Sequence, residues 1–384
     1  MRDKFDVVIV GAGIVGLGAA LAAIKAGKTV CVIDRDARAN GASIRNFGFI
    51  TVTGQRAGAH WARARRSRDV WAEVAEQAGI PVLQRGLVMP AYRPEAAEVL
   101  HGFLATDMGS DCRLITMDEA LRNLPALRQE NLADVLYSPH ELRVESREAL
   151  PKIAAWLAET HGVEFRWQTA AKDIGEDGVL TASGLLRGES ILVCPGDDFS
   201  TLLPGLIASH HLTKCTLQML RVNAPKMPSL GSALMSDHSL ARYEGFSLLD
   251  CAKPLIAHLD AETPAIRAAG IHLIAVQSAD GSLVVGDSHV YGPQAEPFAR
   301  ADFDELILDV FDEVLDLPAR HVTERWCGSY TSSPERTILV ERPAKNIRLV
   351  MVTGGTGAST SFALGEQVIA DLYNPSTANT EALA

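Results

Sequence analysis

The sequence predicts an α/β fold, with one domain built on a largely parallel sheet and a second α+β domain, containing an antiparallel sheet, inserted into it. Three observations predict this fold. Short apolar runs typical of buried parallel strands occur near both ends and in the middle, at residues 5–10, 29–34, 190–196 and 347–353. A glycine-rich turn and a helix follow the first and last of these runs. Strand-rich segments at 212–222 and 271–291 lie between them.

A chain of 384 residues suggests two domains or one large interrupted domain. We expect the first domain to comprise residues 1–82, 144–210 and 322–384, and the inserted domain to comprise residues 83–143 and 211–321. A ligand would bind at their interface, where pockets usually form.

The N-terminal segment contains each part of a dinucleotide-binding motif in order. After the first strand come Gly11, Gly13 and Gly16 in the pattern G-x-G-x-x-G, then a helix, then a second strand that ends at Asp34. Gly11 allows a tight turn, Gly13 lets a pyrophosphate approach the backbone, and Gly16 lets the helix pack closely on the strand. Asp34 can accept hydrogen bonds from a ribose. The segment predicts a Rossmann-like domain and, by itself, fits either FAD or NAD.

Composition excludes several kinds of partner. The net charge of −11 provides no basic face for a phosphate backbone, so no nucleic-acid partner is expected. Glycines and Lys25 interrupt the longest apolar stretch, and no signal-peptide pattern is present, so no membrane partner is expected. Six scattered cysteines lack the spacing of a metal site, which predicts reduced thiols, no metal and a cytoplasmic protein.

Five stretches occur in an order that is typical of one flavoprotein family. They are residues 11–34, 41–48 (GASIRNFG), 163–174 (VEFRWQTAAKDI), 191–200 (ILVCPGDDFS) and 351–369 (VMVTGGTGASTSFALGEQV). Over most of its length the chain resembles the D-amino-acid oxidase / glycine oxidase (DAO) family. The resemblance implies a glutathione-reductase-like FAD domain of the DAO type beside a substrate-binding domain. It also implies an enzyme that moves a hydride from the carbon next to a small amine to flavin N5.

Shorter stretches are similar to a subgroup of these flavoproteins that is associated with aminophosphonate use. They are SIRNFG, RARRSRDVW, SPHELRVESREALP, CTLQMLR, GIHLI, GDSHVYG and ERWCGSYTS. The resemblance implies 2-aminoethylphosphonate or its N-methyl derivative as substrate and molecular oxygen as electron acceptor. The implied products are phosphonoacetaldehyde, the released amine or ammonia, and hydrogen peroxide.

The motif and the resemblance together predict which residues contact FAD. In the C-terminal loop, backbone N–H groups at a helix start would stabilise the negative charge that develops when the flavin is reduced. Ser43 could instead cap a turn, and Arg45 could form a surface ion pair. The predicted FAD contacts are Gly11, Gly13, Ile14, Val15, Gly16, Asp34, Arg35, Ser43, Arg45, Asn46, Ala171, Cys194, Gly196, Gly354, Gly355, Thr356, Gly357, Ala358, Ser359 and Thr360.

The amine side needs binding, orientation and exclusion of water more than it needs strong acid–base groups. The candidate catalytic residues are His272, Tyr330 and His289, with Asp287 beside them in the sequence. Taken alone, His272 fits a structural histidine better than a catalytic one, because apolar residues flank it, and His289 equally fits a turn cap. The candidate substrate-binding residues are Arg45, Lys214, Gln218, Tyr243 and Arg325.

Two positions depart from the family pattern. Gly357 stands where glycine oxidase and its relatives place an arginine that holds the substrate carboxylate, so another cation must hold an anionic tail. Cys327 lies near the flavin-linked cysteine of the family's sarcosine oxidases but one residue out of step relative to Tyr330. We therefore expect FAD to be bound non-covalently.

Four alternatives remain at this stage. The substrate could be glycine, sarcosine or a D-amino acid. The enzyme could be a dehydrogenase that passes electrons to an acceptor other than oxygen. The FAD could be purely structural, or the protein could be an NAD-binding module that is colourless as isolated.

Overall fold

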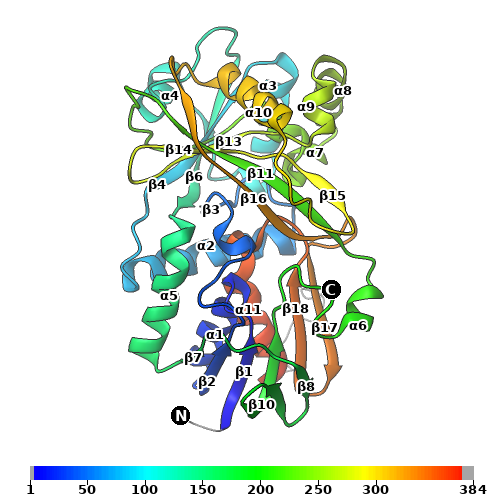
Figure 1. The fold of residues 1–384 in the computed structure, drawn as a ribbon. Coiled ribbons are helices and arrows are strands. Elements are labelled where there is room, and N and C mark those ends of the chain that lie inside the picture. Colours follow the sequence, from blue (N-terminus) through cyan, green and yellow to red (C-terminus); the bar gives the residue numbers. More distant parts are fainter. Residues whose placement is uncertain (1–3, 374–384) are drawn as a thin grey trace.

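The chain folds around two sheets, as the computed structural model shows for residues 4–373. The first sheet lies near the N-terminus and carries the N- and C-terminal segments, and the second lies at the opposite end of the molecule (Figure 1). No helix within residues 4–373 is both long and apolar enough to cross a bilayer.

The first sheet has eight strands, six of them in the order β17-β18-β10-β1-β2-β7. β1 pairs in parallel with β2 and β10, and β10 pairs in parallel with β18, so these strands end at the same edge. The predicted parallel core is therefore confirmed. Its strands are β1 (Lys4–Val10), β2 (Val30–Ile33), β7 (Glu164–Arg166), β8 (Asp173–Gly175), β9 (Gly178–Thr181), β10 (Gly184–Val193), β17 (Ile338–Ala344) and β18 (Ile347–Val352).

Alternating side chains of these strands supply two cores. Val7 and Ile9 face one side with helices α1, α2, α5 and α11, whereas Val8 faces the other side with Val193 and Met351. Because both faces are buried, β2 and the C-terminal half of β1 are apolar throughout rather than alternating with polar residues. The helices of the first side are α1 (Ile14–Lys25), α2 (Ala59–Gln77), α5 (Ser146–His161) and α11 (Gly357–Tyr373).

The second sheet has ten strands, eight of them in the order β15-β11-β14-β13-β12-β4-β6-β3. Its longest pair of strands, β11 and β16, is antiparallel, and the sequence predicts an antiparallel sheet for the insert. Its strands are β3 (Phe49–Ile50), β4 (Gln84–Ala91), β5 (Arg113–Leu114), β6 (Asp134–Arg143), β11 (Thr213–Asn223), β12 (Ala233–Met235), β13 (Ile274–Gln277), β14 (Leu283–Gly286), β15 (Val290–Gly292) and β16 (His321–Ser332).

Short helices cover both faces of this sheet. One core contains side chains of α3, α7 and α8, and the other contains side chains of α4, α9 and α10. The remaining helix, α6, packs against the first sheet. These helices are α3 (Pro94–Leu104), α4 (Met117–Asn123), α6 (Pro204–Ala208), α7 (Glu244–Ser247), α8 (Ala252–Glu262), α9 (Pro264–Ala268) and α10 (Ala301–Val314).

Sheet membership differs from the predicted domain limits at two strands. β3 and β16 belong to the ten-stranded sheet, whereas the sequence predicts residues 1–82 and 322–384 to be part of the first domain. In Figure 1, β16 descends from the second sheet toward β18 of the first. The chain therefore carries residues of the inserted sheet directly to the edge at which the parallel strands end.

Candidate active site

A cavity of about 570 Å³ runs from the ends of the parallel strands to the inserted sheet. Its walls come from the loops after β1, β2, β10 and β18, and from β16 and segments of the insert. The carboxyl ends of parallel strands are where such folds bind dinucleotides. The position of the cavity therefore follows from the topology.

The first glycine loop is held by contacts that exclude any side chain. Gly11 has φ +105°, and a Cβ there would lie 2.3 Å from the carbonyl oxygen of Cys194. A Cβ on Gly16 would lie 1.9 Å from the carbonyl oxygen of Gly11. Only glycine fits either position, so the chain turns tightly from β1 into α1 and directs the start of α1 at the cavity.

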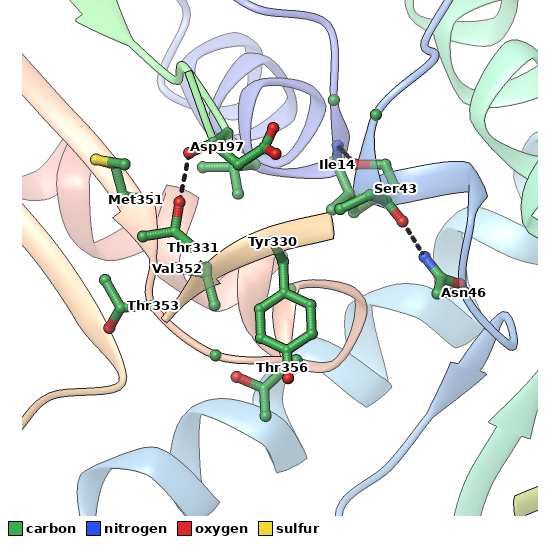
Figure 2. A pocket seen from close by; sticks show the side chains of 18 of the residues that line it. Ile14, Ser43, Asn46, Asp197, Tyr330, Thr331, Met351, Val352, Thr353 and Thr356 are labelled. Atoms are coloured by element: carbon green, nitrogen blue, oxygen red, sulfur yellow. Dashed lines mark hydrogen bonds between the residues drawn. The ribbon is translucent and has the colours of Figure 1, made fainter. Parts of the chain in front are cut away.

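Polar groups gather around the start of α1. The backbone N–H of Ile14 donates to Ser43 Oγ at 3.0 Å, an interaction drawn in Figure 2. The carboxylate of Asp34 accepts from the N–H of Ala12 at 2.7 Å, which holds it at the edge of the groove. The helix dipole adds partial positive charge at this end. This arrangement suits a pyrophosphate and its ribose.

An ion pair crosses the groove beyond Asp34. The guanidinium of Arg35, which follows β2, lies 2.6 Å from the carboxylate of Asp198, which follows β10. Burial would raise the pKa of Asp198, but hydrogen bonds from Thr201, Ser200 and Arg35 outweigh burial and lower this pKa. Both residues line the cavity at the adenosine end of the predicted site.

The second glycine loop lies at the end of β18. Gly354 has open space where a side chain would point, and a Cβ on Gly355 would lie 3.5 Å from the ring of Tyr330. Figure 2 shows this ring beside Thr356. Thr356 Oγ1 is buried and has no hydrogen-bond partner among the described residues. The first amides of α11 also have no partner within the helix.

The donors and the space at this loop fit the pyrimidine edge of a flavin. A bare glycine, an unpartnered buried hydroxyl and a helix start converge on one wall of the cavity. These groups suit the oxygen and nitrogen acceptors of that edge. The loop after β1 would thus hold the pyrophosphate of FAD, and the loop after β18 would hold its flavin.

Most of the predicted cofactor residues line this cavity. Three do not: Gly16, whose role is helix packing, and Ser359 and Thr360, which are buried inside α11. Ser359 Oγ instead accepts from the N–H of Thr51 at 2.9 Å. The lining residues are Gly11, Gly13, Ile14, Val15, Asp34, Arg35, Ser43, Arg45, Asn46, Ala171, Cys194, Gly196, Gly354, Gly355, Thr356, Gly357 and Ala358.

The other end of the cavity contains a buried His–Asp–His cluster. Asp287 Oδ1 lies 3.3 Å from His272 Nε2, and Asp287 Oδ2 lies 3.7 Å from His289 Nε2. Burial lowers the pKa of both histidines, to about 3 for His289. Burial raises the pKa of Asp287, but the neighbouring His289, His272 and Arg242 outweigh burial and lower this pKa to about 2. At neutral pH the cluster is one carboxylate between two neutral imidazoles.

Arg242 is the cation of this end, and sequence reasoning missed it. Its guanidinium donates to Tyr291 Oη at 2.9 Å, and both residues line the cavity. Burial lowers the pKa of Arg242, but Tyr291, Tyr330 and Asp287 outweigh burial and raise it. Tyr330 lies next to the cluster, with its ring centroid 6.4 Å from that of His289.

The predicted substrate-binding residues divide into two groups. Arg45 and Tyr243 line the cavity, with Tyr243 edge-on to His272 at 5.3 Å between ring centroids. Lys214, Gln218 and Arg325 do not line it.

The three residues outside the cavity have other partners. Lys214 lies 3.8 Å from Asp197. The side-chain amide of Gln218 donates to the carbonyl oxygen of Arg300 at 2.8 Å, which joins β11 to the start of α10. Arg325 pairs with Asp304. Cys327 is also absent from the lining, and burial raises the pKa of its thiol.

A second polar group lines the cavity where β3 ends, and it too was not predicted. His60 Nε2 lies 3.1 Å from Gln55 Oε1, and Gln55 Nε2 donates to Thr51 Oγ1 at 2.9 Å. Burial lowers the pKa of His60 to about 4. No local sequence motif predicts these residues. They reach the cavity only through the packing of α2 and of the loop before it.

The fold and the two glycine loops define a flavin-dependent oxidoreductase, and comparison with known families agrees. Residues 6–372 match the model of the DAO family, described as FAD dependent oxidoreductase. The chain belongs to this family, and its cofactor is FAD. The family resemblance seen in the sequence is confirmed. A comparison with curated protein sequences gave no match.

Solved structures share this fold at low sequence identity. L-proline dehydrogenase from P. horikoshii is 18% identical, with a TM-score of 0.79 over 99% of this chain and 96% of that one. Glycine oxidase from Bacillus cereus ATCC 14579 is 18% identical, with a TM-score of 0.77 over 99% and 97%. Iminodiacetate oxidase from Chelativorans sp. BNC1 is 16% identical, with a TM-score of 0.69 over 95% and 94%.

Proposed function

We propose that this protein oxidises a small amine that carries an anionic group. A hydride leaves the carbon next to the nitrogen, and water hydrolyses the resulting imine to an aldehyde and an amine or ammonia. Bound FAD supplies the two-electron acceptor. The guanidinium of Arg242 carries this proposal, because it lies in the cavity wall beside Tyr330, which contacts the flavin-binding loop.

The favoured substrate is 2-aminoethylphosphonate or its N-methyl derivative. A guanidinium together with the Tyr291 hydroxyl offers several donors for the oxygens of a tetrahedral anion. Gly357 leaves the C-terminal loop without an arginine for a carboxylate. The relatives named for glycine, proline and iminodiacetate support the amine part of the proposal, because all three compounds are amines that carry a carboxylate.

Molecular oxygen is the proposed electron acceptor, with hydrogen peroxide as product. The second candidate is a dehydrogenase of the same fold, and the L-proline dehydrogenase of P. horikoshii favours it. Peroxide release during turnover distinguishes the two activities.

The decisive experiment is anaerobic mixing of the FAD-loaded protein with a panel of amines while flavin absorbance is followed. The panel contains 2-aminoethylphosphonate, its N-methyl derivative, glycine, sarcosine and a D-amino acid. We expect the two phosphonates to bleach the flavin, and peroxide to appear when oxygen is admitted. Bleaching by glycine or sarcosine alone would overturn the substrate assignment. A flavin that no amine bleaches would overturn amine oxidation itself.

Arg242→Gln provides a test of the anion site in the same assay. Loss of a charged hydrogen-bond donor costs about 1.5–3 kcal/mol, so half-saturation by the phosphonate should require at least ~10-fold more substrate. Arg325→Gln is the matched control, because Arg325 does not line the cavity. Equal effects of the two variants would contradict the assignment of Arg242.

A further inference from the structure

Three side chains of the cavity bring possible hydrogen-bond acceptors close together. One atom each from His272, Asp287 and His289 lies within 4.8 Å of the others. All three residues are buried, and all three line the cavity. Asp287 Oδ1 has no hydrogen-bond partner among the described residues.

The hydrogen bonds on the far side of each ring fix where the imidazole protons are. His289 Nδ1 lies 3.0 Å from the carbonyl oxygen of Gly270, which can only accept, so Nδ1 carries the hydrogen. His272 Nδ1 lies 3.2 Å from Ser239 Oγ. The Ser239 hydroxyl donates its one hydrogen to the carbonyl oxygen of His272 at 2.7 Å, so Ser239 Oγ accepts from Nδ1.

Both Nε2 atoms therefore present lone pairs to a carboxylate. The imidazoles are neutral, because burial lowers the pKa of each. The three acceptors repel one another, and Asp287 Oδ1 lacks the hydrogen bond that a buried polar group requires. The cluster needs a ligand that brings positive charge and up to three donors.

We propose that the His272–Asp287–His289 cluster binds the ammonium group of the substrate and is the first acceptor of its proton. This inference rests on the proposed function. A primary ammonium has three N–H donors and a single positive charge, which matches two imidazole nitrogens and one carboxylate. An N-methyl ammonium retains two donors.

The charges of the cavity favour an ammonium over a divalent metal ion. Asp287 and Arg242 contribute one negative and one positive charge at this end. A zwitterion adds no net charge, with its ammonium on Asp287 and its anion on Arg242. A divalent ion would leave an uncompensated double positive charge in a buried site, which is costly. The structure therefore assigns the two charged residues to opposite ends of one zwitterionic substrate.

The same geometry provides the deprotonation that oxidation requires. One N–H bond of the ammonium breaks and an N–H bond forms at His272 Nε2, which is the nearer imidazole to Asp287. The new imidazolium pairs with Asp287 Oδ1 across 3.3 Å. The freed nitrogen lone pair then forms the C=N bond as the hydride leaves the adjacent carbon. The proton stays on the histidine, and the two electrons leave with the hydride.

The test compares two ligands of the same shape that differ only in the ammonium group. Binding of 2-aminoethylphosphonate and of propylphosphonate to the dithionite-reduced holoenzyme is measured by anaerobic calorimetry, so no turnover occurs. Wild type should prefer the amine at least ~10-fold. Asp287→Asn should remove this preference while leaving propylphosphonate affinity unchanged. Arg242→Gln should weaken both ligands alike.

Controls keep the outcome independent of folding and of the proposed function. Asp304→Asn, a buried carboxylate outside the cavity, should keep the preference. His272→Gln should reduce the preference even if Asp287→Asn fails to fold. Equal binding of the two ligands by wild type, or a preference retained in Asp287→Asn, would overturn the inference. If the wild-type protein retains one equivalent of added zinc and Asp287→Asn does not, the cluster is a metal site and not an ammonium site.

The two proposals fail in different ways. If amines bleach the flavin but Asp287→Asn keeps the ligand preference, only the ammonium site is wrong. If no amine bleaches the flavin, the proposed oxidation is wrong, whatever the binding data show.

Discussion

A Cβ on Gly365 would lie 2.6 Å from the backbone carbonyl oxygen of Gly18, so α11 and α1 cross with their backbones in direct contact. The reverse contact is equally close, because a Cβ on Gly18 would lie 2.6 Å from the carbonyl oxygen of Ser361. This crossing joins the two ends of the chain. It fixes the starts of both helices, and with them both glycine loops, at one edge of the sheet.

Gly365→Ala should therefore destabilise the protein and loosen FAD together. The added methyl group meets backbone, which cannot rotate away, and such overpacking costs about 1–3 kcal/mol. Urea unfolding and the flavin fluorescence released on dilution measure the two effects. Gly205→Ala is the control, because a Cβ there meets nothing within 4 Å. Loss of stability with unchanged FAD retention would show that the crossing does not position the loops.

Gly13→Val should give a colourless protein even when FAD is added in excess. A Cβ at this position would already lie 3.1 Å from Ser43 Oγ, and the two further methyl groups would enter the space above the start of α1. That space is where the motif places the pyrophosphate. The ratio of flavin to protein absorbance after desalting measures retention. Gly41→Val, beside the same cavity but with open space around it, should stay yellow.

Local spacing was sufficient to predict most of the residues that line the cavity at the ends of the parallel strands. The loops after β1 and β18 are built from consecutive residues whose glycines, strand ends and helix starts are visible in the sequence. The parallel sheet then necessarily brings their ends to one edge. The family resemblance added the loop that contains Ser43 and the segment near Ala171, and both residues line the cavity.

The substrate half was harder to predict, because it depends on strand register and on loop packing. Side chains alternate along a strand, so two neighbouring residues point to opposite faces of the sheet. Leu217 lines the cavity, whereas its neighbour Gln218 points to α10. Arg242 follows a short 3-10 helix at Asp237–Ala241, and no sequence motif predicts that it lines the cavity. Only the assembled insert shows that it faces Tyr291 and Asp287.

His272→Ala should slow flavin reduction by substrate far more than it weakens FAD retention. His272 lies at the end of the cavity that we propose for the substrate, and loss of a positioned proton acceptor slows a reaction by about 10²–10⁴-fold. Anaerobic stopped-flow reduction and FAD dissociation measure the two quantities separately. His101→Ala, an exposed histidine on α3, is the control. Equal losses of reduction and retention would indicate a structural histidine instead.

Acid should destabilise the fold through its buried neutral histidines. The pKa of His289 is lowered from 6.5 to about 3, by burial first and then by Arg242, while Asp287 opposes this shift. Between these two values the unfolded chain binds a proton that the folded chain does not. Stability is therefore fully present above pH 6.5 and falls as the pH drops toward 3, by up to about 1.4 kcal/mol per pH unit for this histidine.

His289→Gln should reduce the slope of the unfolding free energy against pH by the contribution of this histidine, up to about 1.4 kcal/mol per pH unit. Urea unfolding of wild type and variant at several pH values between 6.5 and about 4 measures the difference in slope. His60, whose pKa is lowered to about 4, contributes equally to both proteins over most of this window and cancels in the comparison. Parallel slopes for the two proteins would mean that His289 is protonated in the folded state. Its Nε2 would then donate to Asp287, and the cluster would offer one acceptor fewer for an ammonium.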